Sequence, residues 1–327
     1  MSGVSTRGLK ASNSKQPSGR TLVILNPAAG RGRAGRIRAK VLDAFSHAGM
    51  TYDLVETNAA GEGVQAASQA GKAGYTTIIA VGGDGTISEI VNGLGQATAP
   101  EEPIGTVGIL AVGSGNDFAH ALGISQDLEQ AAQTLVLGRT RACDLGYATI
   151  CTAESTIERY FNNNLGLGLD PQVALESLLL KRLQGLLLYG VAALRALWRY
   201  QPPVMHLQWV GEDGRRDKWH DALLLASVGN TPRSGGGFHL APHAEVDDGL
   251  LDLVFAGALS RWQVLQLLPK AIVGKHLHHP AITFARISHL QIRGAVPFPV
   301  ELDGEVITQR AEHMEIGIHP QRLQVIV

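Results

Sequence analysis

Gly82-Gly83-Asp84-Gly85-Thr86 is the stretch of sequence that decides the fold. It follows a β-branched, apolar run at 76–81 that predicts a buried strand, and it precedes a helical pattern at 87–94. The glycines allow close backbone approach to a ligand and positive φ, and the N–H groups of a helix N-terminus can hold phosphate. Asp84 repels phosphate unless a cation lies between them, so the loop indicates a nucleotide bound with Mg²⁺. A tight strand-to-helix turn capped by Asp84 is the structural alternative.

The first 140 residues alternate between predicted strands and helices. Strands are expected at 22–25, 52–56, 76–81 and 107–112, and helices at 34–48, 63–71, 87–94 and 126–137, with another opening at Phe118. A repeat of roughly 25–30 residues indicates βαβ crossovers and a parallel sheet. Ligands of such sheets bind at the carboxyl ends of the strands, where Asn26, Glu56 and the loops 82–86 and 113–117 fall.

The pattern changes near residue 140 to short strands and hairpins, which predict a mainly antiparallel second domain. Strands are expected at 141–150, 157–169, 204–210, 219–228, 250–255, 281–292 and 298–303. Two helices interrupt them, at 171–200 and at 260–274, the second capped by Ser260. The first is apolar on most of its circumference. It fits either a core helix or a wall over an apolar substrate or membrane.

Length and composition limit the class of protein. The 327 residues suggest two domains, and the net charge of −1 gives no sign of a nucleic-acid partner. Two cysteines, Cys143 and Cys151, fit a reducing compartment such as the cytoplasm. Residues 1–20 are polar and basic without an apolar core, so we expect a disordered tail rather than a secretory signal.

One motif favours a different enzyme class. Residues 30–35 match the G-x-G-x-x-G pattern through Gly30, Gly32 and Gly35, and Glu56 follows at the end of the next strand, as an NAD-dependent oxidoreductase requires. However, Asn26-Pro27-Ala28-Ala29 separates the first glycine from its strand, and Arg31 and Arg33 suit a polyphosphate better. We keep this reading as the alternative.

Six ordered motifs resemble the diacylglycerol kinase catalytic family, in its soluble bacterial branch, which is similar to sphingosine and ceramide kinases. They are Asn26-Pro27-Ala28-Ala29-Gly30-Arg31-Gly32, Gly82-Gly83-Asp84-Gly85-Thr86, Gly113-Ser114-Gly115-Asn116-Asp117-Phe118-Ala119, the segment 161–170, the segment 235–252, and Leu302-Asp303-Gly304-Glu305. NAD kinases and phosphofructokinases share the second motif but not the later ones. The resemblance runs from about residue 22 to the end of the chain.

The resemblance implies an ATP-dependent lipid kinase that phosphorylates the hydroxyl of a membrane lipid such as diacylglycerol. The implied fold is an α/β Rossmann-like nucleotide domain at 21–140, joined by about 312–327, and a mainly antiparallel β-sandwich lipid-substrate domain at 141–311. Work at the inner membrane surface implies peripheral membrane contact, and a homodimer is compatible with the sequence. The sequence does not identify the lipid acceptor, because phosphatidylglycerol, a sphingoid base and a polyprenol also carry a hydroxyl. A non-catalytic lipid-binding protein is disfavoured because every acid needed for catalysis is present.

The resemblance also implies the site residues, with ATP and Mg²⁺ as cofactors. Asp84 and Asp117 would hold the catalytic Mg²⁺, and the proton acceptor would be Asp303 or Glu305, which on a strand would face the same side. The alternative for Asp303-Gly304 is a type I′ turn. The nucleotide contacts would be Asn26, Pro27, Ala28, Ala29, Gly30, Thr57, Gly82, Gly83, Asp84, Gly85, Thr86, Ile87, Ser88, Glu89, Gly113, Ser114 and Asn116.

A second, structural Mg²⁺ is implied at the turn 247–249. The side chain of Asp248 would join the backbone oxygens of Glu245 and Leu250, and oxygen ligands suit this ion. Asp247 is an alternative support for the active-site water network. The histidines at 276, 278 and 279 have irregular spacing, so we expect surface residues rather than a metal site.

Overall fold

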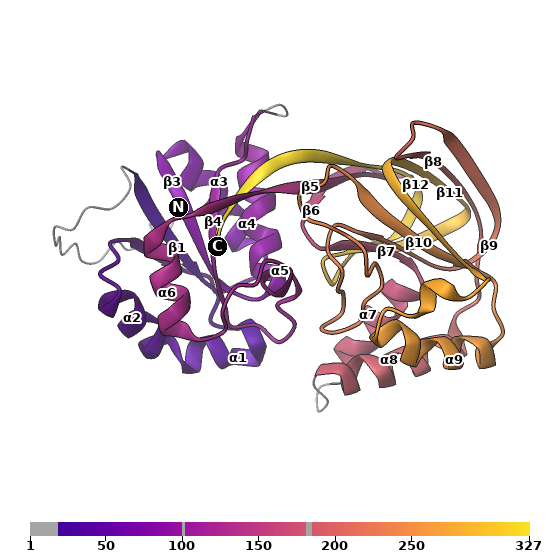
Figure 1. Ribbon diagram of the computed structural model, residues 1–327, viewed down its shortest axis with the longest axis horizontal. Coiled ribbons are helices and arrows are strands. Elements are labelled where there is room, and N and C mark those ends of the chain that lie inside the picture. The colour runs from indigo at the N-terminus through magenta and orange to yellow at the C-terminus, as the bar shows by residue number, and fades with distance from the viewer. Residues whose placement is uncertain (1–18, 100–101, 181–184) are drawn as a thin grey trace.

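The computed structural model describes residues 19–99, 102–180 and 185–327. Its first part is built on β1 (Arg20–Leu25), β2 (Asp53–Glu56), β3 (Tyr75–Gly82) and β4 (Thr106–Ala111), which pair in parallel in the order β2-β1-β3-β4 (Figure 1). Leu22 and Ile24 of β1 pack into one core cluster, and Val23 and Leu25 pack into another. Both faces of this sheet are therefore covered, which confirms the parallel sheet predicted from the apolar runs.

Helices cover the two faces of this sheet (Figure 1): α1 (Ala29–Arg36), α2 (Arg38–His47), α3 (Glu62–Lys72), α4 (Asp84–Ala97), α5 (Asp117–Ala121) and α6 (Leu128–Leu137). The single helix predicted at 34–48 is wrong. The chain leaves helical geometry at Ile37, between α1 and α2. Within α1 it also turns through positive φ at residues 30–32.

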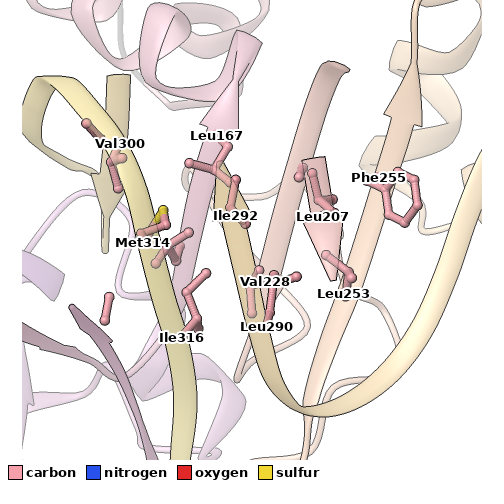
Figure 2. Close-up of a cluster of buried hydrophobic side chains, with 14 of the residues drawn as sticks. Leu167, Leu207, Val228, Leu253, Phe255, Leu290, Ile292, Val300, Met314 and Ile316 are labelled. Carbon is pink, nitrogen blue, oxygen red and sulfur yellow. The ribbon is translucent and has the colours of Figure 1, made fainter. Parts of the chain in front are cut away.

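The second part is antiparallel. It contains β5 (Thr140–Cys151), β6 (Thr156–Phe161), β7 (Asn164–Gly168), β8 (Val204–Gly211), β9 (Arg216–Gly229), β10 (Leu251–Gly257), β11 (Ile282–Leu302) and β12 (Glu305–Ile326). Figure 2 shows the apolar core between these strands, with Leu167, Val228, Leu290 and Met314 among its members. The strand predicted at 157–169 is divided into β6 and β7, and the strands predicted at 281–292 and 298–303 are one strand, β11.

Three helices lie on one side of the second part: α7 (Leu169–Leu179), α8 (Gly185–Arg199) and α9 (Arg261–Ile272), with a short 3₁₀ turn, η1, at His276–His278 (Figure 1). Ser260 caps α9 through a capping box with Gln263, as predicted. The single helix predicted at 171–200 is instead α7 and α8, and residues 181–184 lie outside the described ranges. None of the described helices is long and apolar enough to cross a membrane.

Two long strands, β5 and β12, run between the two parts (Figure 1). At its far end β12 pairs in parallel with β4, through Gln324 with Thr106 and Val325 with Val107. Within the described ranges, the two parts thereby share one mixed sheet of 12 strands. The buried Arg322 also donates to the hydroxyl of Tyr160 at 2.9 Å. The tail expected at 1–20 falls mostly outside the described residues, and β1 already begins at Arg20.

Candidate active site

Three loops meet at the carboxyl edge of the parallel sheet, after β1, β3 and β4. The Asn26 side-chain amide donates to the Thr86 hydroxyl at 3.1 Å, which joins the first loop to the second. Gly83 and Gly113 bring the second and third loops into backbone contact, because a Cβ added to Gly113 would lie 2.4 Å from the Gly83 Cα. Glycine is required at this contact by the close approach of two backbones. The loops predicted to bind nucleotide therefore form one surface.

The first loop is a compact turn. Gly30, Arg31 and Gly32 all have positive φ, and the Gly32 N–H donates to the carbonyl of Ala28 at 2.9 Å. The acid that an NAD-dependent oxidoreductase would use, Glu56, is paired with Arg38 at 2.6 Å. The geometry therefore does not favour the oxidoreductase alternative.

The other predicted nucleotide contacts have distinct environments. Ile87 packs in the core, and the Glu89 carboxylate accepts the N–H groups of Gly61 and Gly63 at the start of α3, both at 2.9 Å. These two side chains are thus engaged away from the loops. Thr57 is buried at the end of β2. Ser88 is buried and Ser114 is exposed, and the rest of the set forms the three loops: Asn26, Pro27, Ala28, Ala29, Gly30, Gly82, Gly83, Asp84, Gly85, Thr86, Gly113 and Asn116.

Asp84 and Asp117 begin α4 and α5 and lie on either side of Gly115. A Cβ added to Gly115 would lie 3.0 Å from Oδ2 of Asp84 and 3.8 Å from Oδ2 of Asp117. Oδ1 of Asp84 accepts the Phe118 N–H at 3.2 Å. Burial, together with the nearby charge of Asp84, raises the pKa of Asp117 to about 6. The structure thus brings together the two acids predicted to hold Mg²⁺.

The second part of the chain adds a third acid, Asp303. Its carboxylate accepts the backbone N–H groups of Asn162, Asn163 and Asn164, the closest at 2.8 Å. The side chain of Asn163 in turn donates to Oδ1 of Asp84 at 3.2 Å. Burial raises the pKa of Asp303 to about 7, against the three N–H donors that lower it, and the charge of Asp84 raises it further.

Asp303 and Glu305 do not face the same side. Asp303 and Gly304 form a two-residue turn with φ of 51° and 88°, and Leu302 pairs with Glu305 across it. The expectation that both acids share one face of a strand is therefore wrong, because a turn separates them. Asp303 is buried toward Asp84, whereas Glu305 is exposed.

The acids at the three loops fit a Mg²⁺ ion that is bound together with phosphate. Asp84 and Asp117 supply carboxylate oxygens, and among the described residues no set of three or more His, Cys, Asp or Glu surrounds a metal position. Mg²⁺ commonly takes one or two carboxylates and completes its shell with water and substrate phosphates. Two carboxylates beside three glycine-containing loops satisfy the protein's share of that requirement.

The second predicted metal site has a different arrangement. Oδ1 of Asp248 accepts the Leu250 N–H at 2.9 Å, and Oδ2 is paired with Arg286. Asp248 supplies the only carboxylate of the set Glu245, Asp248 and Leu250, and Arg286 already neutralises it. The set therefore does not fit a bound cation, and we derive no role for one.

Asp247 and one of the predicted surface histidines, His276, are also engaged. Asp247, the alternative support for a water network, pairs with Arg141 at 2.7 Å. His276 is buried against the carbonyl of Leu240 at 3.1 Å, so the expectation of a surface residue was wrong for it.

Comparison with known proteins identifies the family. Residues 20–148 match the diacylglycerol kinase catalytic domain, and residues 163–327 match the YegS C-terminal NAD kinase beta sandwich-like domain. The diacylglycerol kinase of Bacillus subtilis (strain 168) is 31% identical over 289 residues, covering 88% of this chain and 89% of that protein. The chain belongs to the diacylglycerol kinase family. It is therefore an enzyme, a kinase of lipid metabolism.

Further relatives agree with this assignment. The diacylglycerol kinase of Staphylococcus carnosus (strain TM300) is 26% identical over 287 residues, covering 88% of each chain. The crystal structure of a candidate diacylglycerol kinase from Bacillus anthracis superimposes with a TM-score of 0.74 at 23% identity, covering 96% of this chain and 98% of that one. This likeness confirms the two-domain fold with a mixed sheet.

Three further residues contact the acids and were not predicted, and a fourth supports one of them. Gly236 donates its N–H to Oδ2 of Asp117 at 2.8 Å, and Arg233 lies 3.3 Å from Oδ1 of the same acid. Asn163 contacts Asp84, and its side-chain amide oxygen lies 3.1 Å from the Thr231 hydroxyl. The available signals were a run of three asparagines and an arginine separated by one serine from three glycines.

An apolar cavity of about 130 Å³ lies under α7, α8 and α9. Its walls are largely aliphatic, with Val173, Ala193, Ala256 and Leu267 contributed by four different elements. Asp170 and Ser234 also line it, and Oδ2 of Asp170 is buried without a hydrogen-bond partner. The cavity is therefore an apolar chamber with one polar wall.

The polar wall of the cavity is coupled to the turn that carries Asp303. Burial raises the pKa of Asp170 to about 6. Burial and the charge of Asp170 also raise the pKa of its neighbour Glu301 well above the usual range. Glu301 accepts the N–H of Gly304. Asp170 of the cavity wall is thus connected, through Glu301, to the turn that carries Asp303.

Proposed function

We propose that this kinase uses ATP and transfers its γ-phosphate to the hydroxyl of a membrane lipid such as diacylglycerol. The observation that supports this most directly is the meeting of Asp84, Asp117 and Asp303 beside three glycine loops and close to an apolar cavity. In this proposal residues 21–140 and 312–327 form a Rossmann-like nucleotide domain. Residues 141–311 form a β-sandwich that holds the lipid.

The three loops hold the nucleotide. Backbone N–H groups of Gly30 and of residues 83–85 and 114–116, together with the side chains of Asn26 and Thr86, can donate to phosphate oxygens. Asp84 and Asp117 would hold Mg²⁺. When bound, that ion would offset the charge of the phosphates. The loops and the two carboxylates thereby fix the donor half of the reaction.

Asp303 accepts the proton of the lipid hydroxyl. The hydroxyl oxygen forms a bond to the γ-phosphorus, the bond from that phosphorus to the bridging oxygen of ADP breaks, and the proton passes to the Asp303 carboxylate. A pKa of about 7 suits this role, because a base works best near the operating pH. The N–H groups of residues 162–164 hold the carboxylate in place.

The apolar cavity holds part of the lipid body. A volume of about 130 Å³ accommodates a segment of one acyl chain rather than a whole lipid, so the remainder would stay at the membrane. Phosphatidylglycerol, a sphingoid base and a polyprenol share this chemistry with diacylglycerol. The lipid is therefore to be identified by assay.

A surface on α8 and α9 carries large exposed side chains beside basic ones. Trp198 is 56% exposed and Trp262 is 76% exposed, and the Arg261 guanidinium lies 5.4 Å from the centre of the Trp198 ring. Tryptophan and arginine together favour the interface of an anionic membrane. The same helices line the cavity from inside. We therefore place this surface against the inner face of the membrane, with the enzyme in the cytoplasm.

A screen of hydroxyl lipids in mixed micelles tests the reaction. Labelled ATP and Mg²⁺ should give a phosphorylated product with at least one hydroxyl lipid and none with the corresponding methyl ether. Transfer to no lipid in the panel would contradict the proposal. NAD-dependent oxidation of the same lipids would instead support the alternative function, an NAD-dependent oxidoreductase.

Vesicle binding tests the membrane surface. Replacing Trp198 and Trp262 by Ala should weaken binding to vesicles that contain anionic lipid, while Leu137→Ala, an equally exposed change on the first part, should not. If the double variant binds as the wild type does but shifts sedimentation from dimer to monomer, the surface is a homodimer contact instead.

A further inference from the structure

Arg233 places a guanidinium from the second part of the chain against the acids of the first. Its Nη2 lies 3.3 Å from Oδ1 of Asp117, and its side chain is only 18% exposed. It stands in the segment between β9 and β10, three residues before Gly236, whose backbone N–H also contacts Asp117. The arginine therefore lies where the two halves of the proposed reaction meet.

The segment that carries Arg233 is fixed by several bonds. The Thr231 hydroxyl donates to the Arg233 carbonyl at 3.1 Å, and the Ser234 hydroxyl donates to the side chain of Asn164 at 3.0 Å. Asn164 belongs to the asparagine run whose N–H groups hold Asp303. Arg233 and Asp303 are thus positioned by one network, which is the kind of support that keeps a catalytic group in place.

The guanidinium retains unused bonding capacity. Arginine has five N–H donors, and Nε of Arg233 is buried without a hydrogen-bond partner. A buried donor left unpaired costs free energy, so the position favours a ligand with acceptor oxygens. Phosphate suits the planar fork of arginine, because it can accept two parallel N–H bonds.

We propose that Arg233 is a catalytic residue that contacts the γ-phosphoryl group during transfer. This rests on the proposed ATP-dependent reaction. Charge is spread over the three equatorial oxygens of the phosphoryl group in the transition state, and an arginine supplied from outside the phosphate loops stabilises it. The hydroxyl proton goes to Asp303 and ADP leaves, as in the proposed reaction. Asp117 holds the guanidinium toward the phosphate loops.

The affinities for two nucleotide complexes distinguish a catalytic role of Arg233 from a structural one. The variants are Arg233→Ala and Arg233→Lys, with Arg215→Ala as a control that removes an arginine–aspartate pair in the β8–β9 turn. Affinity is measured for a non-hydrolysable ATP analogue with Mg²⁺, and for ADP with Mg²⁺ and aluminium fluoride, which mimics the transition state.

We expect Arg233→Ala to weaken binding of the transition-state mimic about 100-fold or more. Arginines that contact the transferred phosphoryl group contribute at least that much to the rate of transfer. Affinity for the ATP analogue should change far less. Arg233→Lys should recover little of the affinity for the mimic, because the lysine ammonium lacks the planar pair of N–H donors of arginine. Added guanidinium ion should restore part of the turnover of Arg233→Ala. Arg215→Ala should match the wild type in every measurement.

Three results would overturn the inference. Wild-type turnover and mimic affinity in Arg233→Ala would exclude a catalytic contact. Equal losses of affinity for the two ligands would mean that Arg233 binds the ground state or only positions Asp117. A wild-type enzyme that binds neither ligand would reject the proposed function and this role with it. Thermal unfolding of each variant shows whether a loss reflects misfolding, and the conservative lysine change keeps the test open if the alanine variant does not fold.

Discussion

Asp303→Asn should abolish most of the activity and its pH dependence. With a pKa of about 7, roughly one-tenth of Asp303 is ionised at pH 6 and about nine-tenths at pH 8. The kcat of the wild type should therefore rise about tenfold between these values, because only the ionised acid accepts the hydroxyl proton. Asp303→Asn keeps the shape of the side chain but removes the base. Its kcat should fall about 10²- to 10⁴-fold and lose this rise.

Initial rates in mixed micelles, with ATP and lipid both saturating, measure this effect. Nucleotide affinity is measured in parallel, since Asp303→Asn should leave the donor half intact. Glu305→Gln is the matched control, because Glu305 is exposed on the far side of the turn. A pH rise centred near 7 that survives in Asp303→Asn, or a large loss confined to Glu305→Gln, would refute the assignment of the base.

Other changes probe the rest of the molecule. Gly113→Ala should reduce nucleotide affinity and cost about 1–3 kcal/mol of stability, because its Cβ would meet the Gly83 backbone; calorimetry and titration check both. Ala256→Leu should fill the cavity and raise the KM for lipid but not for ATP; equal shifts in both would contradict this. Burial raises the pKa of Asp252 to about 7, so stability falls as pH rises from about 4 to 7. Asp252→Asn should therefore raise the free energy of unfolding at pH 8 by about 2–4 kcal/mol and leave it unchanged below pH 4, as denaturant unfolding would show. Mg²⁺ should raise the Tm more at pH 8 than at pH 5, where Asp117, with a pKa of about 6, holds a competing proton; equal rises would contradict this.

The loops after β1, β3 and β4 could be predicted because their signals are local. Each follows an apolar strand, contains glycine and opens a helix, and parallel topology brings the strand ends to one edge. The break between α1 and α2 could not be predicted in this way. Ile37 fits the helical pattern, yet it leaves helical geometry between the two helices.

The division of the predicted strand at 157–169 has a tertiary cause. The N–H groups of Asn162, Asn163 and Asn164 turn toward the Asp303 carboxylate, some 140 residues later in the chain. A β-rich sequence gives no sign of such a partner. For the same reason Arg233 was missed, since its partner, Asp117, belongs to the other part of the chain.

The turn at Asp303 shows that a structural and a functional reading of one motif can both hold. Asp-Gly favours a type I′ turn because both residues accept positive φ. That turn separates the two acids and directs Asp303, rather than Glu305, toward Asp84. From the sequence, a turn at Asp303-Gly304 and a proton acceptor at Asp303 were alternative interpretations. In the structure the turn positions the Asp303 carboxylate.

The path of β12 explains why a lipid kinase of this kind would return its last strand to the first part. β12 begins two residues after Asp303, and its far end pairs with β4, which leads into the loop carrying Asp117. One strand thus spans from the proposed base, Asp303, to the sheet that carries the two acids proposed to hold Mg²⁺. Asp117 and Asp303 are buried, and burial raises the pKa of both, which makes their ionised forms costly to the fold. Their proximity is therefore maintained by the strands around them, and a loosened β12 should reduce catalysis before it unfolds either part.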